Sequence, residues 1–222
     1  MIRVEGLSKS YPEADGERVV FRDLDLRADD GQIVVLLGPS GSGKTTLLNL
    51  VSGIDRPTAG RIVIDDVDLT RLGERERTLF RRDRIGFIFQ FFNLIPTRTV
   101  EENLLLPLEL SGRDGPQDHA RAALLLADVG LADRGGAYPD RLSGGEQQRV
   151  AVARALAHDP AVVLADEPTG NLDRETGRTV LRLLESLARS SGKTVLIVTH
   201  SEEAVPLADR VLVLRDGRLT ER

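Results

Sequence analysis

Short apolar runs rich in valine and isoleucine alternate along the chain with longer segments of helical character. The short runs predict strands at residues 19–26, 32–37, 61–64, 85–89, 161–165, 194–198 and 210–214. The longer segments predict helices at residues 44–52, 118–129, 143–158, 174–190 and 201–207. Continuously apolar strands between helices are typical of a sheet that is covered on both faces. The pattern therefore predicts an α/β fold with a mostly parallel sheet.

Two parts of the chain depart from this alternation. Turns rather than helices separate the first strands, which predicts an antiparallel β portion near the N-terminus. Residues 91–142 lack a convincing strand and are interrupted by proline and glycine, so we expect a helical insertion there. Near the other end, Asp216 and Gly217 predict a tight hairpin turn. We expect residues 1–222 to form a single domain that contains this insertion.

Composition narrows the class of protein. The 222 residues carry a formal net charge of −5, whereas a general nucleic-acid-binding surface is usually basic. The absence of cysteine from the sequence excludes disulfides, thiolate metal sites and cysteine nucleophiles. The apolar runs are far shorter than the ~20 residues of a membrane helix, and the N-terminus lacks the apolar stretch of a signal peptide. If the protein serves a membrane, we expect a partner to span it.

Residues 38–45 read Gly-Pro-Ser-Gly-Ser-Gly-Lys-Thr and match the phosphate-binding pattern G-x-x-x-x-G-K-[ST] completely. A predicted strand before the loop and a helix after it disfavour the alternative, a glycine-rich turn without a ligand. Backbone N–H groups and the helix N-terminus would cradle phosphate oxygens. We expect Lys44 to reach the β- and γ-phosphates of a nucleotide and the Thr45 hydroxyl to hold Mg²⁺. The nucleotide-binding residues predicted here are Gly38, Ser40, Gly41, Ser42, Gly43, Lys44, Thr45 and Thr46.

A second acidic motif follows the predicted strand at residues 161–165. Asp166, at the end of the strand, fits the aspartate that supports Mg²⁺ in a P-loop NTPase. Glu167 comes next, points differently, and is suited to polarise the attacking water. Paired acids after a strand also occur at the exposed start of a helix. The phosphate-binding loop in the same chain favours the catalytic interpretation.

Residues 142–149 read Leu-Ser-Gly-Gly-Glu-Gln-Gln-Arg and resemble the signature sequence of ABC ATPases. Ser143 and Glu146 also have the spacing of a capping box, so a simply capped helix is the plainer interpretation. The two interpretations are compatible, because the Ser143 hydroxyl and the amides of Gly144 and Gly145 also form an anion site.

Other residues match the same family in the expected order, so that the resemblance covers nearly the whole chain. Gln90 resembles the Q-loop glutamine, and His200 resembles the switch histidine. Residues 170–173, Gly-Asn-Leu-Asp, resemble the D-loop, although alanine is commoner than Asn171 in the family. Tyr11 lies where the family places an aromatic residue against adenine. The resemblance implies a P-loop NTPase core with ATP and Mg²⁺ as cofactors.

The resemblance also implies roles for individual residues. Glu167, His200 and Gln90 are the implied catalytic residues, and Thr45, Gln90 and Asp166 are the implied metal ligands. In the family each ATP is sandwiched between two chains, which implies a homodimer that forms on ATP binding. The implied nucleotide contacts outside the phosphate loop are Tyr11, Ser143, Gly144, Gly145 and Asp173.

A cluster of apolar residues at 90–96, Gln-Phe-Phe-Asn-Leu-Ile-Pro, follows the predicted strand at 85–89. Apolar residues in a loop favour a docking surface over ordinary core. In ABC transporters this region receives a coupling helix of an integral membrane subunit, so the resemblance implies a permease partner here. The sequence of this segment and that of residues 165–173 are similar to the corresponding sequences in the ATPases of lipoprotein-releasing, macrolide-exporting, peptide-resistance and cell-division systems. This branch implies a cytoplasmic protein held on the inner face of the cell membrane by its partner.

Other classes remain as alternatives. A soluble ABC ATPase that acts on nucleic acid, ribosomes or cofactor assembly usually carries long insertions or duplicated cassettes, which this sequence lacks. A GTPase would need an Asn-Lys-x-Asp motif, which is also absent from the sequence, and a small-molecule kinase would not need the signature. The charged segment at residues 71–84 fits a solvated helix face better than a nucleic-acid patch. We expect no direct nucleic-acid partner.

Overall fold

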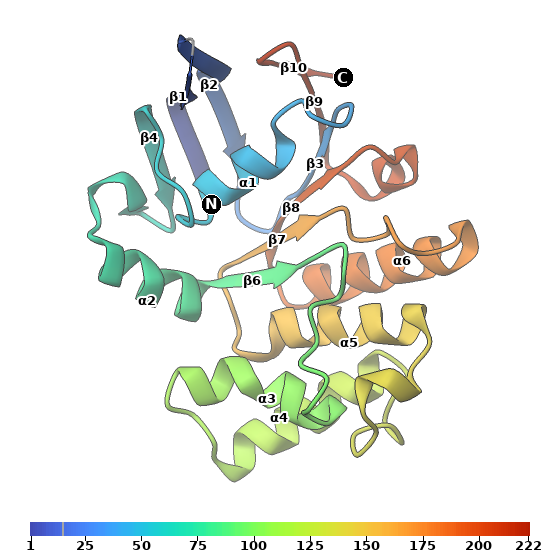
Figure 1. The fold of residues 1–222 in the computed structure, drawn as a ribbon. Coiled ribbons are helices and arrows are strands. Elements are labelled where there is room, and N and C mark those ends of the chain that lie inside the picture. The colour runs from blue at the N-terminus through green and yellow to red at the C-terminus, as the bar shows by residue number, and fades with distance from the viewer. Residues whose placement is uncertain (15) are drawn as a thin grey trace.

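The computed structural model describes residues 1–14 and 16–222, whose strands form two sheets (Figure 1). The strands are β1 (Ile2–Glu13), β2 (Gly16–Ala28), β3 (Ile33–Leu37), β4 (Ala59–Ile64), β5 (Val67–Asp68), β6 (Ile85–Ile88), β7 (Val162–Asp166), β8 (Thr194–Thr199), β9 (Arg210–Arg215) and β10 (Arg218–Glu221). The α-helices are α1 (Lys44–Val51), α2 (Glu74–Arg84), α3 (Val100–Leu110), α4 (Pro116–Asp128), α5 (Gly144–Ala157) and α6 (Arg174–Ser190). The short 3₁₀ helices are η1 (Leu69–Arg71), η2 (Pro139–Arg141) and η3 (Glu202–Leu207).

The larger sheet has the strand order β10-β9-β3-β8-β7-β6, and every neighbouring pair from β9 to β6 is parallel. All five residues of β3 are buried, because both faces of the sheet are covered. Val35 packs with α3, α4, α5 and α6 on one face, and Val34 packs with α1 and the smaller sheet on the other. Figure 1 shows this layering, with α5 and α6 on one side of the sheet and α1 on the other. The predicted α/β fold with a mostly parallel sheet is confirmed.

The smaller sheet is antiparallel, has the order β2-β1-β4-β5, and is the predicted N-terminal β portion. Its strand β1 was not expected from the sequence. A register shift between Val4 and Leu7 breaks the alternation of buried and exposed side chains, and further shifts follow up to Ser10. Because β-bulges add residues to one strand, the period of two that marks a strand is lost there.

The stretch at 91–142 contains no strand and holds α3, α4 and η2. Both α-helices pack against α5, and Leu104 of α3 and Leu126 of α4 share one hydrophobic core with the parallel sheet. Of these helices, only α4 was placed from the sequence. The charged segment at 71–84 contains helix α2, whose residues other than Arg77 remain partly or fully exposed. The division into one domain with an insertion stays a prediction.

The remaining expected strands and helices agree with the structure within two residues at each end, except that β2 begins three residues before the expected residue 19 and that one helix has a different form. The helix expected at residues 201–207 is the 3₁₀ helix η3, with Pro206 inside it. Proline has no N–H to donate, so a regular α-helix does not extend through this segment. The expected hairpin turn joins β9 to β10, and both Asp216 (φ 51°) and Gly217 (φ 72°) have the positive φ that such a turn requires.

Candidate functional site

The phosphate-binding loop runs from the end of β3 to the start of α1. It lines an open cavity of about 860 Å³ together with residues of β2 and the turn between β9 and β10. Gly43 has a φ of 99°, and a Cβ there would lie 2.6 Å from Val20. A Cβ on Gly38 would lie 2.6 Å from the Leu214 carbonyl oxygen. Only glycine fits these positions, so the motif is required by close packing as well as by its ligand. The predicted residues that line the cavity are Ser40, Gly41, Ser42, Gly43, Lys44, Thr45 and Thr46.

Lys44 lies inside the loop, with only 7% of its surface exposed. Its ammonium group donates hydrogen bonds to the carbonyl oxygens of Gly38 (2.8 Å) and Pro39 (3.1 Å). The same nitrogen lies 3.8 Å from a Glu167 carboxylate oxygen. A buried ammonium needs such partners, since an unpaired one is costly. The lysine therefore connects the phosphate loop to the acidic end of β7.

Thr45 and Asp166 meet at this end of the sheet, where the Thr45 hydroxyl donates to an Asp166 carboxylate oxygen at 3.3 Å. Burial raises the pKa of Asp166, and the Glu167 charge raises it further, whereas the Thr45 hydrogen bond and Lys44 lower it. A hydroxyl and a partly buried carboxylate are hard oxygen donors of the kind that Mg²⁺ prefers when phosphate and water supply its other ligands. Residues 1–14 and 16–222 contain no cluster of three or more His, Asp or Glu side chains that would hold a metal unaided. The site fits a cation bound jointly with a phosphate ligand.

Glu167 is held by the end of the neighbouring strand β8. It has a φ of 47°, in the left-handed region, and its N–H donates to the Val198 carbonyl oxygen at 2.9 Å. One carboxylate oxygen accepts hydrogen bonds from the Thr199 hydroxyl (2.8 Å) and the His200 N–H (3.2 Å). The other lies 3.0 Å from His200 Nδ1. The strained backbone and these contacts fix the direction of the carboxylate, a combination that is common at functional sites.

Gln90 lies in the loop after β6, beside the turn that precedes α6. The Asn171 amide donates to the Gln90 carbonyl oxygen at 2.8 Å, and the Gln90 amide donates to Asn171 Oδ1 at 3.5 Å. Within the described part of the chain, the Gln90 side chain has no hydrogen bond to Thr45 or Asp166. The structure thus places the third predicted metal ligand against Asn171.

The signature residues and Asp173 lie outside the wall of the phosphate cavity. The Ser143 hydroxyl accepts from the Glu146 N–H at 3.3 Å, and a Glu146 carboxylate oxygen accepts from the Ser143 N–H at 2.8 Å, which is the predicted capping box. Asp173 caps α6 by accepting from the Thr176 N–H at 3.0 Å, and these contacts lower the pKa of Asp173. In this first turn of α5, the N–H groups of Gly144 and Gly145 precede the capped Glu146 N–H and are the ones that a ligand could reach.

Tyr11 also lies outside the lining of the phosphate cavity. Its hydroxyl donates to an Asp55 carboxylate oxygen at 2.8 Å, and the Lys9 ammonium lies 4.5 Å from the centre of its ring. The Arg18 guanidinium, 5.7 Å from the ring centre, does line the cavity. Burial and the Asp55 contact raise the pKa of Tyr11. The ring is thus near the edge of the site, and its contact with adenine stays a prediction.

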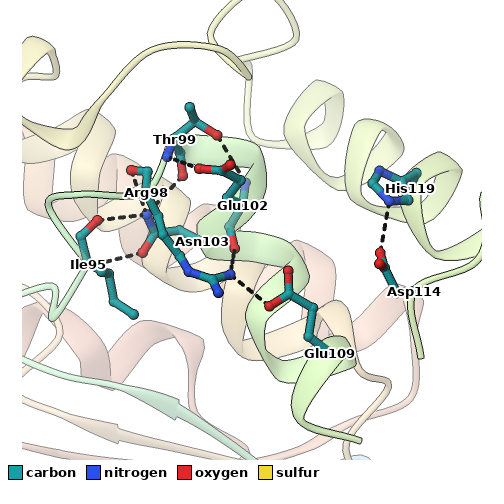
Figure 2. Close-up of polar contacts among 8 residues, drawn as sticks. All are labelled: Ile95, Arg98, Thr99, Glu102, Asn103, Glu109, Asp114 and His119. Carbon is teal, nitrogen blue, oxygen red and sulfur yellow. Dashed lines mark hydrogen bonds and ion pairs between the residues drawn. The ribbon is translucent and has the colours of Figure 1, made fainter. Parts of the chain in front are cut away.

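The predicted docking loop, residues 90–96, is exposed at its tip and held from inside. Phe91 is 70% exposed. Arg154 of α5 donates to the carbonyl oxygens of Phe92 (2.8 Å) and Asn93, and burial lowers the pKa of this guanidinium to about 10. The fully buried Asn103 accepts from the Ile95 N–H at 2.7 Å and donates to its carbonyl oxygen at 3.1 Å, as Figure 2 shows. The loop is therefore a fixed apolar projection.

Sequence reasoning missed the residues that hold the site in place. Thr199 was placed only next to the end of a strand, and Arg154 and Asn103 were given no role. Asn171 was noted only as a departure from the commoner alanine. Each contact joins residues that are separated in the sequence, by 8 positions for Asn103 and Ile95 and by 81 positions for Asn171 and Gln90. Local patterns do not record such contacts.

Comparison with known proteins finds similarity to the ATP-binding proteins of ABC transporters. A family model described as ABC transporter matches residues 21–170. An uncharacterized ABC transporter ATP-binding protein of Mycobacterium tuberculosis is 52% identical over 99% of this chain and 88% of its own length. The lipoprotein-releasing system ATP-binding protein LolD of Syntrophus aciditrophicus is 45% identical over 99% of this chain and 98% of its own.

A solved structure of an ATP-binding cassette has the same fold. The ATP-binding cassette MJ0796, from Methanocaldococcus jannaschii, was solved as a dimer in a post-hydrolysis state bound to ADP and Pi. It superimposes with a TM-score of 0.90 at 39% identity, over 100% of this chain and 98% of that one. Across residues 1–14 and 16–222, no helix combines the length and the apolar character needed to cross a bilayer.

Proposed function

The chain belongs to the ABC transporter family of ATP-binding proteins, and we propose that it is the energising subunit of a membrane complex. It is an ATPase. The observation that carries the hydrolytic part of this function is the arrangement of Glu167, which is fixed by Thr199 and His200 and lies beside the buried ammonium of Lys44. A carboxylate held in this way next to a phosphate loop suits hydrolysis of a terminal phosphate.

In the proposed mechanism, Glu167 accepts a proton from the attacking water, and His200 keeps the carboxylate and the water in line. Lys44 exchanges the carbonyl oxygens of Gly38 and Pro39 for phosphate oxygens, so its charge stabilises the negative charge on the transferred group. Bound Mg²⁺ would neutralise phosphate charge. It would be held by Thr45 and Asp166, with Gln90 as a further ligand.

We propose a homodimer as the active form. Ser143, Gly144, Gly145 and Asp173 are absent from the lining of the phosphate cavity, so we assign them to the nucleotide of a second copy of the chain. The first turn of α5 offers N–H groups and a partial positive charge to that phosphate. The dimeric form of the related cassette supports this assembly.

The dimer is tested with Glu167→Gln, which keeps the size of the side chain but removes the base. We expect this variant to bind ATP without turnover and to form a dimer with Mg-ATP in size-exclusion chromatography with light scattering. The double variant Glu167→Gln/Ser143→Arg, which places a bulky side chain at the first turn of α5, should remain monomeric. A Glu167→Gln protein that stays monomeric at saturating Mg-ATP would contradict the two-chain site.

We further propose that an integral membrane permease docks at residues 90–96 and holds the protein on the cytoplasmic face of the membrane. The fixed projection of Phe91 offers an apolar contact of the kind that a partner helix would cover. The likeness to LolD supports the branch whose systems release lipoproteins, export macrolides or resist peptides. Closure of the dimer on ATP would move the permease, and hydrolysis would reopen it.

The partner is tested by pull-down of tagged Glu167→Gln protein from detergent-solubilised native membranes, with and without Mg-ATP. We expect recovery of one polytopic protein with a large extracytoplasmic domain, and loss of that protein with Phe91→Asp. Recovery of soluble proteins or nucleic acid alone, from a preparation with full ATPase activity, would instead favour a soluble ABC ATPase.

A further inference from the structure

The segment that carries Asn171 is in contact with both the loop of Gln90 and the start of α5. Asn171 donates to the Gln90 carbonyl oxygen at 2.8 Å and accepts from the Gln90 side-chain amide at 3.5 Å. The Asn171 side chain thus binds Gln90 twice, through a short bond to its backbone carbonyl and a longer bond from its side-chain amide. It ties the loop after β6 to the turn before α6, 81 residues further along the chain.

Gly170 provides the space in which the Gln90 side chain lies. A Cβ at this position would lie 2.8 Å from Gln90 Nε2 and 3.1 Å from its Cδ and Cγ atoms. The backbone of Gly170 lies outside the left-handed region, so a side chain at this position would be opposed only by the Gln90 side chain and not by the φ angle. The absence of a side chain at Gly170 and the amide of Asn171 together form a seat for Gln90.

The same turn also touches the signature segment. A Cβ on Gly144 would lie 3.6 Å from Leu172, and one on Gly145 would lie 2.5 Å from Thr176 in the first turn of α6. Leu172, next to Asn171, and Thr176, in the first turn of α6, thus both lie close to the part of α5 assigned to the nucleotide of the second chain. A shift of that part of α5 would therefore displace the seat of Gln90.

We propose that Gly170 and Asn171 form a latch that holds Gln90 in a resting position, away from Thr45 and Asp166, until the two chains close. Asn171 is thus a positioning residue that acts through Gln90. The proposal rests on the proposed role of Gln90 as a metal ligand.

The latch predicts that a weaker seat makes Gln90 available at a lower Mg²⁺ concentration. One hydrogen bond between uncharged groups changes an equilibrium by about fivefold. In Asn171→Ala both bonds to Gln90 are lost, and in Gly170→Ala the added methyl group displaces the side chain. We therefore expect each variant to lower the Mg²⁺ concentration for half-maximal nucleotide binding by about three- to tenfold.

The measurement is a Mg²⁺ titration of the binding of a fluorescent ATP analogue, with every variant made in the Glu167→Gln chain to prevent hydrolysis. Gly136→Ala is the matched control, because a Cβ there meets nothing within 4 Å and the residue lies outside the left-handed region. Asn171→Ala and Gly170→Ala are each repeated with Gln90→Ala. Thermal melting of the nucleotide-free proteins checks that each variant is folded.

We expect both latch variants to lower the Mg²⁺ requirement, Gly136→Ala to leave it unchanged, and Gln90→Ala to abolish the effect of either. An unchanged or raised Mg²⁺ requirement in folded Asn171→Ala and Gly170→Ala would overturn the latch, as would an effect that persists without Gln90. If Gln90→Ala alone leaves the Mg²⁺ requirement unchanged, the metal role of Gln90 fails and the latch fails with it. If Gln90→Ala raises the requirement while the latch variants have no effect, only the latch is wrong.

Discussion

Replacing Thr199 with valine removes the hydroxyl that binds the carboxylate of Glu167, the proposed catalytic base, and changes the shape of the side chain very little. The Thr199 hydroxyl donates to Glu167 at 2.8 Å and accepts from the Ser201 N–H at 3.0 Å, and the residue is 2% exposed. A hydrogen bond to a charged group contributes about 1.5–3 kcal/mol. If that energy is needed to hold Glu167 for proton transfer, kcat for ATP hydrolysis falls by about 10- to 100-fold. Thr199 is outside the lining of the phosphate cavity, so KM for ATP should change by less than about twofold.

A matched control exists in the same strand. Thr194 is also 2% exposed, but its hydroxyl binds only backbone, accepting from the Gly31 N–H at 3.1 Å and donating to the Asp29 carbonyl oxygen at 3.3 Å. Both substitutions should lower the free energy of unfolding by about 1–2 kcal/mol. Only Thr199→Val should lower kcat. Steady-state ATPase assays with urea denaturation separate the two effects, and equal kcat values in the two variants would refute the positioning argument.

Three further predictions test other parts of the structure. Gly43→Ala should weaken ATP binding by roughly tenfold or more, because it combines a left-handed backbone with a steric clash, whereas Gly136→Ala should bind normally in the same titration. Asn103→Leu should lower the free energy of unfolding by about 2–4 kcal/mol in urea denaturation, since it leaves the buried backbone groups around Ile95 unpaired; a loss below 1 kcal/mol would contradict this. Contacts with Asp114, which Figure 2 shows, and with Glu101 raise the pKa of His119 above its ordinary value of 6.5. Because the pKa of His119 is higher in the folded protein than in the unfolded chain, the stabilisation from its contacts with Asp114 and Glu101 is complete below pH ~6.5. This stabilisation is lost as pH rises through the folded-state pKa. A pKa of His119 at or below 6.5 in an NMR titration would show that these contacts do not form.

Much of the site was predictable because its main motifs are contiguous in the sequence. The phosphate loop is one segment whose strand, glycines, lysine and hydroxyl are all read locally. Asp166 and Glu167 follow directly after a buried strand, so their position at the end of the sheet was also expected. The parallel sheet followed from strands that are apolar at every position, since both of their faces are buried.

The parts that were not predicted depend on contacts between distant segments. The bulges of β1 disrupt its alternation, and they arise from pairing with β2 and β4. Helix α3 lies in a stretch that was expected to be helical but whose boundaries were not placed. It begins at the Thr99 cap, where Glu102 completes a capping box. The seat of Gln90 and the hydrogen bond of Thr199 to Glu167 depend on side chains meeting across the fold, which no local pattern encodes.

Helix α5 begins at the Ser143 cap and is anchored along its length to two different loops. Gln148 donates to the carbonyl oxygens of Phe89 (3.3 Å) and Pro168 (2.7 Å), while Arg154, further along, holds the docking loop through Phe92. Its 14 residues span roughly 21 Å at 1.5 Å per residue. A rotation of about 10° at one end would displace the other by roughly 3.6 Å over that length. Under the proposed function, the helix would therefore turn a small tilt at its first turn into a larger displacement of the proposed docking loop.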